Sequence, residues 1–271
     1  MIGPITIALL TALFAWWFFT GAILFAVRLA DRFGNEAHDT ITIYGLGFFF
    51  LGIIGVYQSF NDLNVFNVYL GFFSALAIWG WIELAFLSGF VTGPNKSTAP
   101  PNIPEWQRFV RAWGTLAYHE TLLLIVLGLM IFFMLETENN ISMLVFAILY
   151  LARVSAKLNL YFGVPRINVE FIPEKLKHLP SHFRKRKLNW FFPISITALT
   201  FAVAFWLQGL FGANGSAEKT EYALLLALTA LALLEHWLMV LPLPDAKLWR
   251  WMLPAAHTIK KDLRSEEAHG L

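Results

Sequence analysis

Seven ionisable side chains lie inside long apolar stretches of this sequence and are the residues best suited to chemistry. They comprise three carboxylates, two cations and two imidazoles: Glu83, His119, Glu120, Arg153, Lys157, Glu235 and His236. Each costs about 2.5–3.5 kcal/mol to insert at the centre of a membrane helix, so such groups usually mark function or a structural ion pair. Arg153 and Lys157 are four residues apart and therefore share one helix face.

The charges of these seven residues nearly balance, which favours a buried polar network closed by paired hydrogen bonds. In this interpretation the network fixes how the helices pack, and no catalytic residue is assigned.

A metal site is a second interpretation. Carboxylate and imidazole ligands suit non-haem iron or a di-iron centre. The candidate ligands are Glu83, His119, Glu120, Glu235 and His236. Against it, the Glu-x-x-His spacing of di-iron helices is absent, and adjacent His-Glu pairs diverge by about 100° around a helix.

Contact with a pigment or a quinone is a third interpretation, because a neutral histidine in an apolar helix can ligate the magnesium of a chlorophyll. Aromatic residues accompany the histidines in the sequence: Trp79, Trp81, Trp113, Tyr118 and Trp237. Aromatic richness alone is more typical of an interfacial belt. The cofactor therefore stays open between a non-haem metal, bacteriochlorophyll and none.

The elements that position these groups are transmembrane helices. Of the 271 residues, 58% are hydrophobic and only 14% are charged, against roughly 25% charged in soluble domains. Runs of about 20 apolar residues, the length that crosses a bilayer, recur along the chain. We predict an all-α transmembrane domain over residues 1–243, a basic loop over 163–189 and a tail over 244–271. The predicted spans cover about 4–27, 41–60, 66–91, 113–135, 141–162, 190–211 and 220–241.

The distribution of Lys and Arg predicts the orientation, because cytoplasmic loops retain these residues during insertion. The first, third and fifth loops and the tail carry nearly all of them, whereas the second and fourth loops carry none and the sixth only Lys219. The N-terminus is therefore predicted to be periplasmic and the C-terminus cytoplasmic. All seven ionisable residues then fall in the cytoplasmic half of the membrane.

The run Arg184, Lys185, Arg186 and Lys187 abuts an apolar span. This position indicates a topology signal and a contact for anionic lipid headgroups, and not a nucleic-acid site. In the tail, Lys247, Trp249, Arg250 and Trp251 have the composition of an interfacial segment.

Glycines at positions 45, 47, 52 and 55 are predicted to allow close helix packing. The sequence contains no cysteine, which excludes thiolate metal sites, and it has no phosphate-binding loop, dinucleotide fingerprint or nucleophile elbow.

Several stretches resemble a known family. They are Trp79-Gly80-Trp81-Ile82-Glu83 through Gly93-Pro94, Tyr118-His119-Glu120, Ala152-Arg153 through Pro165-Arg166, and Leu234-Glu235-His236-Trp237 through Trp249. Together they are similar to the PuhE-type photosynthetic complex assembly proteins (photosynthetic complex assembly protein 2 family) of purple phototrophic bacteria.

The resemblance implies a multi-pass protein of the bacterial inner, intracytoplasmic membrane. Its implied role is to assist assembly of the photosynthetic reaction centre and core antenna, with their subunits as partners and a link to bacteriochlorophyll supply. It brings no catalytic residues. A non-enzymatic factor is favoured. A metal-dependent, di-iron-like oxidoreductase acting on a pigment, carotenoid or quinone is the alternative, and a transporter is third because internal repeats are missing.

Overall fold

The computed structural model describes residues 3–243, which form a helical bundle with no β-strand in that range. The long helices are α1 (Pro4–Phe33), α2 (Asn35–Ser59), α3 (Val65–Leu87), α5 (Ala117–Met134), α6 (Ile141–Phe162), α7 (Phe191–Gly212) and α8 (Ser216–Leu238). The shorter ones are α4 (Glu105–Gly114) and the 3-10 turns η1 (Val169–Phe171), η2 (Glu174–Leu176) and η3 (Leu179–His182). All seven long helices are long and apolar enough to cross a membrane, which confirms the predicted class. The predicted interfacial tail lies outside the described residues.

The helices begin and end at points that hydropathy alone does not mark. Helix α1 continues through polar residues to Phe33 and stops only at Gly34, whose φ of 94° starts the turn into α2. Such a positive φ is open to glycine at little cost. The stretch predicted as the fourth span from residue 113 is divided by a break at residues 115–116, so that α4 is a separate amphipathic helix before α5.

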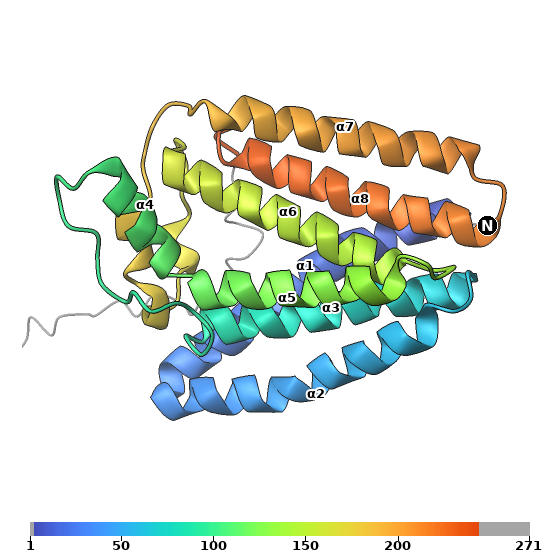
Figure 1. The fold of residues 1–271 in the computed structure, drawn as a ribbon, viewed down its shortest axis with the longest axis horizontal. Coiled ribbons are helices and arrows are strands. Elements are labelled where there is room, and N and C mark those ends of the chain that lie inside the picture. The colour runs from blue at the N-terminus through green and yellow to red at the C-terminus, as the bar shows by residue number, and fades with distance from the viewer. Residues whose placement is uncertain (1–2, 244–271) are drawn as a thin grey trace, which may run out of the picture.

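The connections alternate between the two ends of the bundle (Figure 1). Helix α4 and the segment between α6 and α7 gather at one end, and the described N-terminus and the α7–α8 connection lie at the other. The most basic connections thus share one end, here called the basic end. Its assignment to the cytoplasm stays a prediction.

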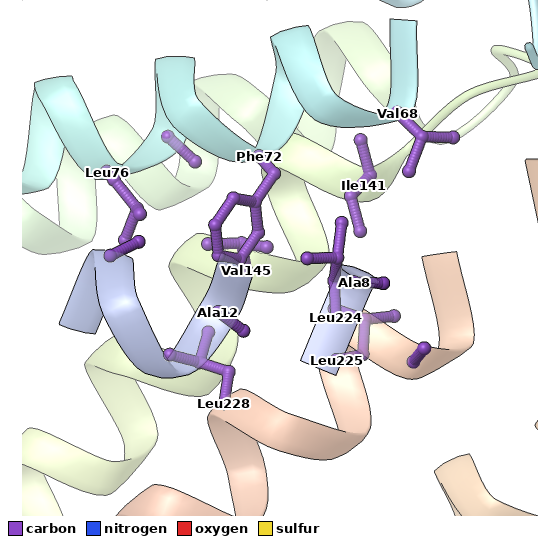
Figure 2. Close-up of a cluster of buried hydrophobic side chains, with 13 residues drawn as sticks. Ala8, Ala12, Val68, Phe72, Leu76, Ile141, Val145, Leu224, Leu225 and Leu228 are labelled. Atoms are coloured by element: carbon purple, nitrogen blue, oxygen red, sulfur yellow. The ribbon is translucent and has the colours of Figure 1, made fainter. Parts of the chain in front are cut away.

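One of the buried apolar clusters lies toward the end of the bundle opposite the basic end and ties α1 to α8. Ala8, Ala12 and Ala15 of α1 are fully buried against Leu224 and Leu228 of α8 (Figure 2). Small side chains at this spacing form one face and let two helices approach closely. Farther along, α1 leaves α8 and crosses the bundle toward α2 (Figure 1). The diverging half of α1 leaves space between helices at the basic end.

The α2–α3 contact tests the predicted glycine packing. A Cβ on Gly52 would lie 2.9 Å from the Ser74 carbonyl oxygen and 2.7 Å from the Ile78 side chain, and a Cβ on Gly55 would also collide with Ser74. A Cβ on Gly47 would meet nothing within 4 Å. The prediction was therefore wrong for Gly47, which sits on the outer face of the same helix.

We expect Gly52→Ala to lower the free energy of unfolding by about 1–3 kcal/mol, because the backbone of α3 would have to move. Gly47→Ala is the matched control on the same helix, and it should leave stability unchanged or raise it slightly, since alanine favours a helix more than glycine does. Detergent-titrated unfolding followed by circular dichroism measures both. Equal effects of the two substitutions would contradict the close α2–α3 packing.

Candidate functional site

A cavity of ≈ 640 Å³ opens where α1 diverges from α8. Helices α1, α3, α6 and α8 form its walls, and α4 and the segment 166–183 contribute to its lining from the basic end. Most lining side chains are apolar, among them Phe19, Ile23, Leu76 and Trp79. Its size falls within the roughly 300–1,000 Å³ of small-molecule sites.

Two ion pairs lie in the wall of this cavity. Arg153 donates a hydrogen bond to Glu83 at 3.1 Å, and the Lys157 ammonium lies 2.5 Å from Glu120. The two cations share one face of α6, and their acidic partners come from α3 and α5. His119 lies behind the first pair, with its Nε2 3.8 Å from the Glu83 carboxylate and its ring against Phe86. These contacts link three helices through charge.

The remaining two predicted residues belong to different contacts. The Nδ1 of His236 lies 2.8 Å from the Ala232 carbonyl, and its Nε2 lies 2.9 Å from the Ser155 hydroxyl. A carbonyl oxygen only accepts, so Nδ1 donates, and the neutral ring accepts from Ser155. Glu235 faces the cavity and accepts a hydrogen bond from the Trp16 indole at 2.8 Å.

The structure thus separates the seven predicted residues into two groups. Five line the cavity: Glu83, Glu120, Arg153, Lys157 and Glu235. The imidazoles of His119 and His236 are buried behind the wall. Neither ring is presented to the cavity as a ligand for a magnesium-centred pigment would be.

The five predicted metal ligands are not brought together. Within residues 3–243, no three His, Asp or Glu side chains form a group that could hold a metal ion. Glu83 and Glu120 are each engaged by a cation, and His236 uses both ring nitrogens.

Comparison with known proteins shows which family the chain belongs to. Residues 2–260 match the family described as "Protein of unknown function (DUF3623)". The chain belongs to the DUF3623 family. It is also 49% identical, over 91% of its length and 90% of the relative's, to an uncharacterised 30.4 kDa protein of Rhodobacter capsulatus encoded in the puhA 5′ region. No solved structure matches it.

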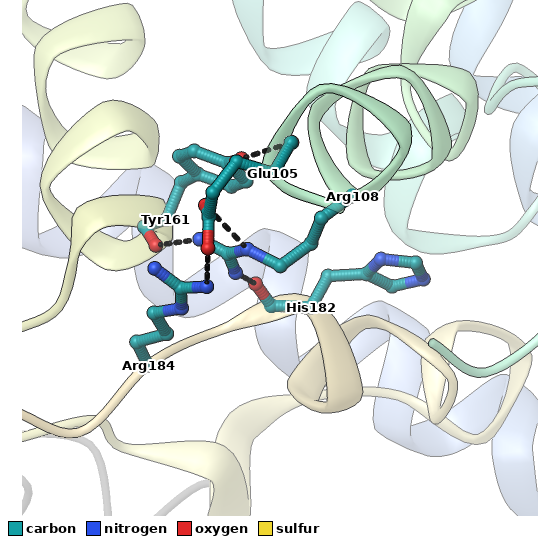
Figure 3. Close-up of polar contacts among 5 residues, drawn as sticks. All are labelled: Glu105, Arg108, Tyr161, His182 and Arg184. Carbon is teal, nitrogen blue, oxygen red and sulfur yellow. Dashed lines mark hydrogen bonds and ion pairs between the residues drawn. The ribbon is translucent and has the colours of Figure 1, made fainter. Parts of the chain in front are cut away.

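The fold of this DUF3623 protein also contains a polar cluster that was not predicted from the sequence, at the junction of α4, α6 and η3 (Figure 3). Arg108 donates hydrogen bonds to the backbone carbonyls of Tyr161 at 2.7 Å and His182 at 3.1 Å, and its guanidinium stacks 3.8 Å from the centre of the Tyr161 ring. Glu105 pairs with both Arg108 and Arg184. We call this set the α4 latch, since it holds α4 beside the cavity.

One residue of the predicted basic run, Arg184, belongs to the α4 latch. Lys185, Arg186 and Lys187 are exposed, whereas Arg184 is half-buried and bonded to Glu105. The hydrogen bond from Arg184 lowers the pKa of the Glu105 carboxyl, which keeps the pair charged. The sequence signal that could have revealed the latch is the Glu105–Arg108 spacing of one helical turn. The pairing with Arg184, 79 residues away, has no local signal.

A pH dependence follows from the buried histidines of the same segment. Burial lowers the pKa of His182 and of His178 below 6.5, helped at His182 by Arg108 and Arg111 and at His178 by Lys96 and His182. Above pH 6.5 these rings are neutral in both the folded and the unfolded chain. Below it, the unfolded chain takes up protons that the folded chain does not, so stability falls until the folded pKa is reached.

We expect thermal stability to fall as the pH drops below about 6.5, with each histidine contributing at most about 1.4 kcal/mol per pH unit. His182→Gln should flatten this dependence and retain a donor for the Ser97 carbonyl, which lies 3.2 Å from Nε2, because the glutamine amide nitrogen reaches the position of Nε2. Melting curves at several pH values measure it. An unchanged slope in the variant would show that His182 is not responsible.

Proposed function

We propose that this protein is a non-enzymatic membrane factor that assists assembly of the photosynthetic reaction centre and core antenna in the bacterial inner, intracytoplasmic membrane. The observation that carries the proposal is the relative's gene location, in the puhA 5′ region of a purple bacterium, at 49% identity over nearly the whole chain. The resemblance to PuhE-type assembly proteins points to the same process. The partners are then reaction-centre or antenna subunits, within the lipid bilayer.

The geometry of the site supports a binding role more than a catalytic one. The carboxylates of Glu83 and Glu120 are neutralised by cations of α6, so they are unsuited to act as general bases. A metal-dependent oxidoreductase would need a ligand set, and the described residues offer none. A bundle with a large apolar cavity and a docked segment at its basic end suits a protein that holds hydrophobic subunits or a pigment during assembly.

The test is a strain that lacks the gene, complemented with the wild-type gene as control. We expect reaction-centre and core-antenna absorption to fall in intact membranes, with no unprocessed pigment accumulating and with complementation restoring both complexes. An unprocessed pigment intermediate in the mutant would favour the oxidoreductase instead. Normal levels of both complexes would contradict the assembly role.

A further inference from the structure

Glu235 and Arg153 differ from the other charged residues of the cavity because each retains capacity for a ligand. Glu235 accepts one hydrogen bond, from Trp16, and no cation within residues 3–243 lies within ion-pair distance of it. Arg153 donates one hydrogen bond, from Nη2 to Glu83, while 41% of its side chain stays exposed. Both residues contribute to the lining of the cavity.

The two residues line the same cavity and form no ion pair with each other. A carboxylate acceptor and a guanidinium donor therefore face the same space, and a ligand can lie between them.

The charges select the ligand. An anion near Arg153 would be repelled by Glu235, and a cation near Glu235 would be repelled by Arg153. A neutral head group with a hydrogen-bond donor on one side and a carbonyl on the other satisfies both residues. The apolar walls, which include Phe19, Ile23 and Trp79, suit a hydrocarbon tail.

We propose that the cavity binds a neutral, lipid-soluble molecule whose head group donates a hydrogen bond to Glu235 and accepts one from Arg153 through a carbonyl or hydroxyl oxygen. A quinol has this chemistry, because each of its hydroxyls can both donate and accept a hydrogen bond. A quinone has only accepting carbonyls, so it can bond to Arg153 and not to Glu235. The site goes beyond the assembly role and does not depend on it, because it rests on the cavity and its two available polar groups.

The experiment measures equilibrium binding of two radiolabelled probes to the full-length protein in lipid nanodiscs, with empty nanodiscs subtracted. The probes are a benzoquinone with a ten-carbon tail and its reduced quinol, which is kept anaerobic. We expect saturable binding of both, tighter for the quinol because it alone can donate a hydrogen bond to Glu235. Decylbenzene, which has the same tail and no polar head, should not compete with either probe.

Glu235→Gln should weaken quinol binding about tenfold, the loss expected for a hydrogen bond to a charged group. It should leave quinone binding nearly unchanged. The control Glu221→Gln makes the same change 14 residues earlier in α8, about 21 Å away, and should affect neither probe. Arg153→Lys keeps a cation beside Glu83, and it should weaken quinone binding.

The proposal is overturned if the quinol does not bind saturably to the wild-type protein, or if decylbenzene displaces it. It is also overturned if Glu235→Gln and Glu221→Gln have equal effects. Should Glu235→Gln fail to fold, the decylbenzene competition on the wild-type protein and the Arg153→Lys variant decide the question.

Discussion

Replacing Lys157 with methionine should lower the free energy of unfolding by about 3–5 kcal/mol, the range for breaking a buried ion pair. The substitution leaves the Glu120 carboxylate, only 2% exposed, without its cation 2.5 Å away. Methionine has nearly the shape of the lysine stem, so the loss reports charge and not packing. Detergent-titrated unfolding of the purified protein measures it.

Two further variants make this result specific. The double variant Lys157→Met with Glu120→Leu removes both charges and should recover most of the lost stability, since a well-packed apolar pair replaces a buried ion pair at little cost. Lys177→Met makes the same change in the exposed pair of Lys177 and Glu174, which are 78% and 72% exposed. Lys177→Met should lower the free energy of unfolding by less than about 1 kcal/mol.

If the double variant is as unstable as Lys157→Met alone, the loss of stability does not come from an unpaired carboxylate.

Arg108→Ala should detach α4 from the rest of the basic end. The change removes both hydrogen bonds to the Tyr161 and His182 carbonyls and the stacking on the Tyr161 ring. Hydrogen bonds to a charged group contribute about 1.5–3 kcal/mol each, so we expect a local loss of at least about 3 kcal/mol. Backbone hydrogen exchange across residues 105–114 and 179–184 should accelerate by a factor of about 100 or more.

The control for this variant is Arg111→Ala on the same helix. Arg111 is exposed, and its side chain forms no hydrogen bond or ion pair with another described residue. It should therefore leave hydrogen exchange in both segments nearly unchanged. Similar acceleration by both variants would indicate that α4 is held by its general positive charge and not by the α4 latch. If Arg108→Ala accelerates hydrogen exchange in α4 alone, η3 is anchored independently of the α4 latch.

The positions of the helices could be predicted from the sequence because hydrocarbon imposes a length and a composition on any segment that crosses it. The helix α6 occupies the expected residues 141–162, and all seven apolar segments form helices. Ends were harder to predict. Helix α1 continues past its apolar stretch through Arg28 and Arg32. A helix can do so as long as its backbone hydrogen bonds are satisfied, and hydropathy carries no information about that continuation.

The cost of charge in an apolar span also marked the chemically relevant residues. Five of the seven singled out on that basis line the cavity, and Arg153 and Lys157 share a face as their spacing requires. Trp16 could not be found in this way, since one indole among many apolar residues carries no signal until a carboxylate from α8 meets it.

The sequence alone thus determined which segments form helices long and apolar enough to cross a membrane, and which side chains are too costly within them without partners. The partners, the cavity and the exposure of each face were decided by tertiary structure. Periodicity treats Gly47 and Gly52 alike, and only the approach of α3 distinguishes them. The cavity exists because α1 packs closely on α8 through its alanines and then diverges, and that path depends on contacts between residues more than 200 positions apart.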